Sequence, residues 1–212
     1  MTTVLIDYES GNLHSAEKAF ARMASEVGAG EVIVSAEPEI VRRARRVVLP
    51  GDGAFPACRA ALLAKPGLFE ALHEAVIGAG RPFLGICIGM QMMATRGLEY
   101  SPTPGLDWIG GEVAPIAPDS PALKVPHMGW NDLVIDRPHP VLTGIATGDH
   151  AYFVHSYQFC VADPAHLLAH VAYGGPVTAI VGRDNMVGTQ FHPEKSQAVG
   201  LRLIANFLRW AP

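Results

Sequence analysis

The side chain in this sequence best suited to nucleophilic chemistry is Cys87, within Gly85-Ile86-Cys87-Ile88-Gly89. A G-x-nucleophile-x-G pattern between an apolar strand and a helix is typical of a nucleophile elbow, where the nucleophile occupies a strained turn. The glycines remove side chains that would collide with the neighbouring strand and helix. The turn also places the sulfur near a helix N-terminus, where partial positive charge favours the thiolate. Taken alone, the segment fits a buried structural cysteine equally well.

A second reactive pair lies far along the chain, where Thr189-Gln190-Phe191-His192-Pro193-Glu194 reads as a strand running into a turn. In extended backbone, side chains two residues apart project to the same side. The Glu194 carboxylate is therefore expected to orient the His192 imidazole and to stabilise the imidazolium that forms when it takes the thiol proton. Together with Cys87 the pair supplies nucleophile, base and orienting group, in a chain order that differs from that of α/β-hydrolases.

Acyl chemistry also needs backbone N–H groups aimed at a carbonyl oxygen that gains charge. Leu49-Pro50-Gly51-Asp52-Gly53 follows another apolar run, and its glycines permit close backbone approach. An ordinary glycine-rich turn is the alternative. We predict that the backbone at Gly51, Asp52 and Ile88 forms the oxyanion hole.

The elements that must position these groups alternate between apolar runs and amphipathic segments in the first half of the chain. Strands are expected at about 3–7, 32–34, 46–50 and 82–86, and helices at about 13–23, 56–64, 68–79 and 88–95. This alternation indicates a parallel sheet covered by helices on both faces. Reactive groups in such sheets lie at the carboxyl ends of the strands, where Cys87 is expected.

The second half is rich in Pro and Gly from Ser101 to Pro140 and carries little helix. Strands are expected at about 132–136, 151–155, 167–173, 177–182 and 186–191, with a closing helix at about 196–210. We expect these strands to be antiparallel additions to the sheet. With no linker and no repeat, the prediction is an α/β fold of three layers in a single domain, residues 1–212.

Composition excludes several classes of function. A net charge of -4 argues against nucleic acid as a partner. The basic run at 42–46 fits a solvated helix face, or a patch for an acidic partner. Three widely spaced cysteines form neither a disulfide framework nor a zinc motif, so no metal or cofactor is expected. We expect a cytoplasmic enzyme, since the sequence shows neither a signal peptide nor the roughly 18 apolar residues of a membrane span.

The three motifs together resemble those of the triad (class I) glutamine amidotransferases. The matching stretches are Pro50-Gly51-Asp52-Gly53-Ala54-Phe55, Gly85-Ile86-Cys87-Ile88-Gly89-Met90-Gln91 and Gln190-Phe191-His192-Pro193-Glu194-Lys195-Ser196. Further stretches at 7–13, 124–131 and 152–157 are similar to the glutaminase subunits of imidazole glycerol phosphate synthases, in histidine biosynthesis. The resemblance covers about residues 4 to 208.

The resemblance implies roles for particular residues. Cys87, His192 and Glu194 would form the triad. Gln91 and Glu99 would hold glutamine, Glu99 by its α-ammonium group, while the backbone at Ser156 and Tyr157 would meet the α-carboxylate. The positions implied to face a synthase partner are Tyr8, Asn12, Met128, Trp130, Tyr152 and Lys195.

Two positions depart from the family pattern. The family usually has glycine at the position of Glu9 and commonly valine at the position of Asp52. A carboxylate aimed at a developing oxyanion would oppose the reaction, so the Asp52 side chain is expected to face away. For His127 and His155 a chemical role and a packing or interface role both stay open, the second being favoured.

A glutaminase of this length implies a partner. Ammonia acts as a nucleophile only while unprotonated, and water near neutral pH would protonate it, so it must pass directly to an acceptor site. The fold occupies the whole chain, so a second polypeptide is implied; in the family it is a (β/α)₈ cyclase. The alternatives are a glutaminase subunit of another synthase, a stand-alone cysteine hydrolase or peptidase, and a non-catalytic pseudo-glutaminase.

Overall fold

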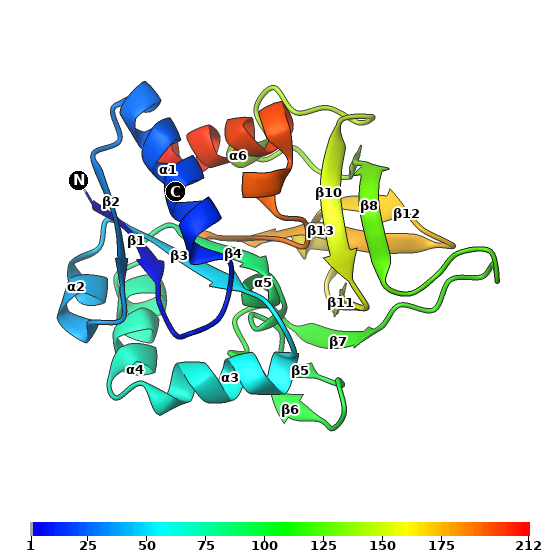
Figure 1. Ribbon diagram of the computed structural model, residues 1–212, viewed down its shortest axis with the longest axis horizontal. Coiled ribbons are helices and arrows are strands. Elements are labelled where there is room, and N and C mark those ends of the chain that lie inside the picture. Colours follow the sequence, from blue (N-terminus) through cyan, green and yellow to red (C-terminus); the bar gives the residue numbers. More distant parts are fainter. Residues whose placement is uncertain (1) are drawn as a thin grey trace.

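The computed structural model describes residues 2–212 and shows a central sheet between two layers of helices (Figure 1). Helices α1 (Leu13–Val27) and α6 (Gln197–Arg209) pack against each other on one face, where the rings of Phe20 and Phe207 meet edge to face. The other face is covered by α2 (Pro38–Arg43), α3 (Phe55–Ala64) and α4 (Leu68–His73), which a π-helical turn, Glu74–Gly78, continues. The predicted three-layer α/β fold is confirmed.

The main sheet has eight strands in the order β2-β1-β3-β4-β14-β13-β12-β9. The parallel part consists of β2 (Glu31–Ser35), β1 (Thr2–Ile6), β3 (Arg46–Gly51), β4 (Phe83–Cys87) and β14 (Met186–Thr189). Antiparallel pairing then adds β13 (Pro176–Arg183), β12 (Leu167–Ala172) and β9 (Val134–Ile135). Strands β3 and β4 are buried along their whole length, as expected for strands covered on both faces.

The prediction that all strands of the second half are antiparallel additions to this sheet is wrong in two respects. Strand β14 pairs in parallel with β4, and several other strands lie outside the sheet. Strands β8 (His127–Asp132) and β10 (His150–His155) form a separate antiparallel ribbon. The strands β11 (Tyr157–Val161), β7 (Gly111–Pro115), β5 (Arg96–Gly97) and β6 (Thr103–Pro104) form another small sheet, and of these the sequence pattern predicts none. Three 3₁₀ turns lie at Pro140–Leu142, Pro164–His166 and Pro193–Lys195.

The helix after Cys87 is also shorter than predicted. Helix α5 covers only Ile88–Gln91 instead of reaching residue 95. The Met92 and Thr95 carbonyls accept hydrogen bonds from the N–H groups of Leu106 and Gly105. Because these carbonyls bond a distant segment, the chain leaves the helical path.

Glycines allow β3, β4 and α5 to approach one another closely beside the elbow. A Cβ atom on Gly85 would lie 2.6 Å from the Gly89 carbonyl oxygen, and one on Gly51 would lie 2.7 Å from the Gly89 nitrogen. A Cβ on Gly89 would overlap the backbone carbonyl oxygen of Leu49. These neighbours are backbone atoms of buried residues in α5 and β3, which cannot move aside as a flexible side chain could.

We therefore predict that Gly89→Ala lowers the free energy of unfolding by about 1–3 kcal/mol or more, because the added methyl group collides with fixed backbone. Gly78→Ala is the matched control, since a Cβ on Gly78 meets nothing within 4 Å. Urea denaturation of both variants checks the prediction. Equal losses of stability would show that the close approach at Gly89 is not constraining.

Candidate active site

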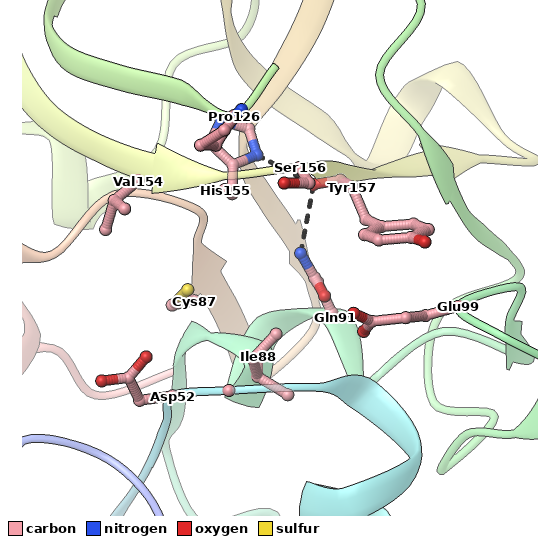
Figure 2. Close-up of a pocket in the computed structure, with 11 residues that line it drawn as sticks. Asp52, Cys87, Ile88, Gln91, Glu99, Pro126, Val154, His155, Ser156 and Tyr157 are labelled. Atoms are coloured by element: carbon pink, nitrogen blue, oxygen red, sulfur yellow. Dashed lines mark hydrogen bonds between the residues drawn. The ribbon is translucent and has the colours of Figure 1, made fainter.

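Cys87 ends β4, at the carboxyl edge of the parallel strands, and has the backbone conformation expected of an elbow. Its φ is 55° and ψ is -111°, a region that residues other than glycine rarely occupy. Only 4% of the residue is exposed, and it lines a cavity of about 250 Å³ (Figure 2). A strained residue that presents a thiol to a small cavity is suited to attack on a small substrate.

His192 and Glu194 meet as predicted, although not through an extended strand. His192 Nδ1 lies 2.9 Å from Glu194 Oε1, with the two side chains 4% and 3% exposed. His192 is extended, but Pro193–Lys195 is a 3₁₀ turn, and this turn brings the carboxylate back to the imidazole. The Ser196 hydroxyl donates to the His192 carbonyl at 2.7 Å, and the His192 N–H donates to the Tyr152 carbonyl at 3.2 Å. These bonds fix the backbone beneath the imidazole.

The electrostatics favour a charged imidazole. Burial by itself lowers the pKa of His192, but hydrogen bonds to Cys87 and Glu194, with the negative charges of both, raise it to about 10. The imidazolium is thus the stable form at neutral pH, and it stabilises a Cys87 thiolate beside it. Helix α5 has four residues, too few aligned peptides to give the dipole effect expected from the sequence.

The predicted oxyanion segment lies at this site, but one of its N–H groups is engaged elsewhere. The Asp52 N–H donates to the Ser10 hydroxyl at 3.2 Å, and that hydroxyl donates to the Asp52 carbonyl at 2.8 Å. Gly51 is buried, while Asp52 lines the same pocket as Cys87 and is exposed, so its carboxylate is not removed from the site as expected. Ile88 also lines the pocket, and its N–H, at the start of α5, has no intrahelical acceptor.

All four predicted substrate-binding residues line the cavity with Cys87 (Figure 2). Glu99 and Cys87 lie on opposite sides of it, and Glu99 Oε2 accepts a hydrogen bond from the Phe55 N–H at 2.7 Å. Gln91 Nε2 donates to the Tyr157 carbonyl at 3.2 Å, which leaves Gln91 Oε1 buried with no protein partner among residues 2–212. The pocket thus offers a carboxylate, a buried acceptor oxygen and a thiol.

Sequence reasoning left one side chain at the sulfur without a role. The Gln190 amide nitrogen lies 3.6 Å from Cys87 Sγ, and the residue is completely buried. The available signal was a polar residue placed directly after an apolar strand. Pro126, Val154 and His155 also line the cavity without having been predicted to do so.

His127 and His155 form a buried chain of hydrogen bonds. The Asp132 N–H donates to Asn131 Oδ1, so the Asn131 amide nitrogen faces His127 Nε2, at 3.2 Å. His127 Nδ1 then donates to His155 Nε2 at 2.9 Å, and His155 Nδ1 donates to the Tyr157 carbonyl at 2.8 Å. Burial lowers the pKa of both histidines to about 4, so both are neutral near pH 7. This chain supports packing roles for both.

Most residues expected to face a partner are accessible. Met128 and Trp130 on β8 are 62% and 48% exposed, and the Trp130 ring lies 5.8 Å from that of Tyr152 on β10. Asn12 is exposed and caps α1, while Lys195 is half-buried in the turn after His192.

Tyr8 is the exception and corrects the prediction. It is 0% exposed, and its hydroxyl donates to the Pro50 carbonyl at 2.7 Å, beneath the oxyanion segment. Burial, the largest effect, raises the pKa of this hydroxyl well above its usual value, so it remains a donor. Tyr8 therefore supports the segment at 50–53 from inside and offers no surface to a partner.

Glu9, at a position where glycine is usual, has a φ of 65°, which a residue with a side chain adopts only with strain. Its carboxylate pairs with Lys65 at 2.6 Å on the surface. Within residues 2–212 there is no helix long and apolar enough to cross a membrane, and no cluster of three metal-binding side chains.

Comparison with known proteins identifies the family of this chain. The family model described as "Glutamine amidotransferase class-I" matches residues 4–210. The "Imidazole glycerol phosphate synthase subunit HisH" of Cereibacter sphaeroides is 73% identical over the full length of both chains, and that of Ruegeria pomeroyi is 68% identical, again over the full length of both.

Solved structures resemble the fold at low identity. A crystal structure of a glutamine amidotransferase aligns with a TM-score of 0.72 at 17% identity, covering 97% of each chain. The structure of PurLQS from Thermotoga maritima aligns with a TM-score of 0.68 at 14% identity, covering 98% of this chain and 97% of the other. The chain therefore belongs to the class-I glutamine amidotransferases and, within them, to the family of HisH subunits.

Proposed function

We propose that Cys87, His192 and Glu194 hydrolyse L-glutamine to glutamate and ammonia. The carrying observation is the buried His192–Glu194 pair beside a strained cysteine that lines a small cavity. The Cys87 thiolate attacks the side-chain amide carbon, and backbone N–H groups at Ile88 and at 51–52 hold the oxyanion. His192 gives its proton to the leaving nitrogen and then takes one from the water that hydrolyses the thioester.

The pocket fits the two ends of the glutamine backbone. The Glu99 carboxylate suits the α-ammonium group, and Gln91 Oε1, a buried acceptor without a protein partner, suits a substrate N–H group. The backbone at Ser156 and Tyr157 receives the α-carboxylate. With the α-carbon held on this side, the side-chain amide reaches toward Cys87 on the other.

The protein is the glutaminase subunit of imidazole glycerol phosphate synthase in histidine biosynthesis, in line with the class-I glutamine amidotransferase family and with relatives 73% and 68% identical that are named as HisH subunits of that synthase. We propose that the whole chain acts as one domain and passes ammonia to a (β/α)₈ cyclase subunit. The exposed side chains of Met128 and Trp130 on β8 support an interface with the cyclase on that strand, because large apolar side chains rarely lie together on a free surface. The three cysteines are free thiols, which suits a reducing cytoplasm.

The contact between Ser10 and Asp52 supports a resting state for the isolated subunit. While the Asp52 N–H donates to Ser10, it is not available to an oxyanion. Rotation of the flexible peptides at 51–53 when the cyclase binds would release it and start glutamine hydrolysis only when ammonia has an acceptor.

We predict that the isolated chain hydrolyses glutamine slowly and that Ser10→Ala raises this basal rate by up to about tenfold, because one hydrogen bond that holds Asp52 in place is lost. Glutamate release, measured with and without the cyclase, checks both points. Equal rates of glutamine hydrolysis with and without the cyclase would show that the isolated subunit has no inactive resting state.

We predict that Cys87→Ala abolishes glutamine-dependent synthesis by the complex, while ammonium salts still support the cyclase reaction, because only the nucleophile is lost. Product formation from each nitrogen source is the measurement. Continued turnover with glutamine would mean that Cys87 is not the nucleophile. Wild-type protein inert toward glutamine in the complex would instead favour a pseudo-glutaminase.

We predict that Glu194→Gln lowers glutaminase kcat by at least about tenfold. The amide oxygen can still orient His192, but loss of the negative charge lowers the raised pKa of the imidazole, and each unit is worth about 1.4 kcal/mol. The active imidazolium–thiolate pair, present below the His192 pKa of about 10, would then be lost at a lower pH. A pH profile that keeps the wild-type alkaline limb would contradict the assignment.

A further inference from the structure

Gln190 contacts the reacting sulfur, although the mechanism above gives it no part. It follows β14, is 0% exposed, and places its amide nitrogen 3.6 Å from Cys87 Sγ. It is absent from the residues that line the glutamine cavity, so it meets the sulfur from the interior.

The hydrogen-bond chain fixes which end of the Gln190 amide faces the sulfur. The Tyr157 carbonyl can only accept, so the group of Gln91 that lies 3.2 Å from it must be the amide nitrogen. This same nitrogen lies 3.0 Å from the Gln190 side chain, which must present its oxygen there. The remaining end of Gln190, beside Cys87, is therefore the NH₂ group, a donor.

The direction of approach matters for catalysis. The cavity side of Cys87 stays open to the substrate, because Gln190 is fully buried and is not among the residues that line the cavity. A donor in that place stabilises charge on the sulfur without blocking attack. Inside a protein such a bond to an anion is stronger than in water.

We propose that Gln190 is a catalytic residue that acts as a second, permanent hydrogen-bond donor to the Cys87 thiolate, beside His192. The inference rests on Cys87 being the nucleophile of the proposed function. His192 must give its proton to the leaving nitrogen, whereas an amide N–H is not transferred. Gln190 therefore stabilises the sulfur anion in the free enzyme and again when the thiolate leaves during thioester hydrolysis.

The other titratable groups near the sulfur are known. His192, the Tyr8 hydroxyl and the Cys58 thiol lie close enough for their charges to interact with it. Asp52, Glu99, Tyr157 and the neutral His155 line the same cavity, and Glu194 pairs with His192. Of these groups only His192 carries positive charge, so the sulfur anion has a single cationic partner and a neutral donor adds to its stabilisation.

The test is the pH dependence of Cys87 alkylation by iodoacetamide in the full chain, followed by mass spectrometry of the Cys87 peptide. Gln190→Met keeps the volume and removes the donor, so the alkylation midpoint should rise by about one pH unit. Gln190→Glu places a carboxylate at the sulfur while Gln91 keeps an acceptor, so its midpoint should rise further. Alkylation needs neither glutamine nor the cyclase, so it tests the donor separately from the proposed function.

Gln158→Glu is the matched control, since the Gln158 side-chain oxygen accepts from the Thr178 N–H and its amide does not bond the sulfur. Its midpoint should equal that of the wild type. Folded Gln190 variants with lower melting temperatures but unchanged midpoints would reduce Gln190 to a packing residue and overturn the proposal. If both variants unfold, NMR of the wild type decides between the two outcomes. A change in the chemical shift of the Gln190 side-chain amide protons as Cys87 titrates supports the hydrogen bond, and an unchanged shift refutes it.

Discussion

The site depends on a single steric constraint, the contact of backbone with backbone among β3, β4 and α5. Gly51, Gly85 and Gly89 have no side chains to hold these elements apart, and the resulting approach fixes Cys87 in its strained conformation. The same approach places the oxyanion segment at the end of β3 next to the elbow at the end of β4. Burial along both strands keeps this arrangement rigid, because a packed interior transmits strain instead of absorbing it.

Around this rigid turn, charge is stabilised by buried partners instead of by water. Glu194 orients His192 and raises its pKa, so that the imidazolium and the thiolate can coexist in a site where each alone would be costly. The helix dipole, expected to help, contributes little because α5 is one turn long. The charge on the sulfur is therefore stabilised mainly by side chains from the end of β14 and the turn after it, which lie far from Cys87 in the sequence.

What could be predicted from the sequence is mostly local. Apolar runs such as 46–50 and 82–86 gave strands, and the glycines around Cys87 gave the elbow, because short-range sterics decide both. The shortness of α5 and the burial of Tyr8 could not be predicted, since each depends on a contact with a distant segment. The bond between Ser10 and Asp52 joins residues 42 positions apart, and nothing in the type of either residue indicates that the two are partners. The contact between His192 and Glu194 was predicted, but it arises from a 3₁₀ turn and not from the extended strand on which the prediction was based.

The bond from the His192 N–H to the Tyr152 carbonyl has an evolutionary consequence. It ties His192, the proposed catalytic base, to β10 through main-chain atoms, which every amino acid possesses. The half-buried side chain at position 152, which we propose lies at the partner interface, can therefore change with a partner surface while the imidazole keeps its place. Selection on subunit recognition and selection on the chemistry act on different atoms of the same residue, so the two can diverge at independent rates.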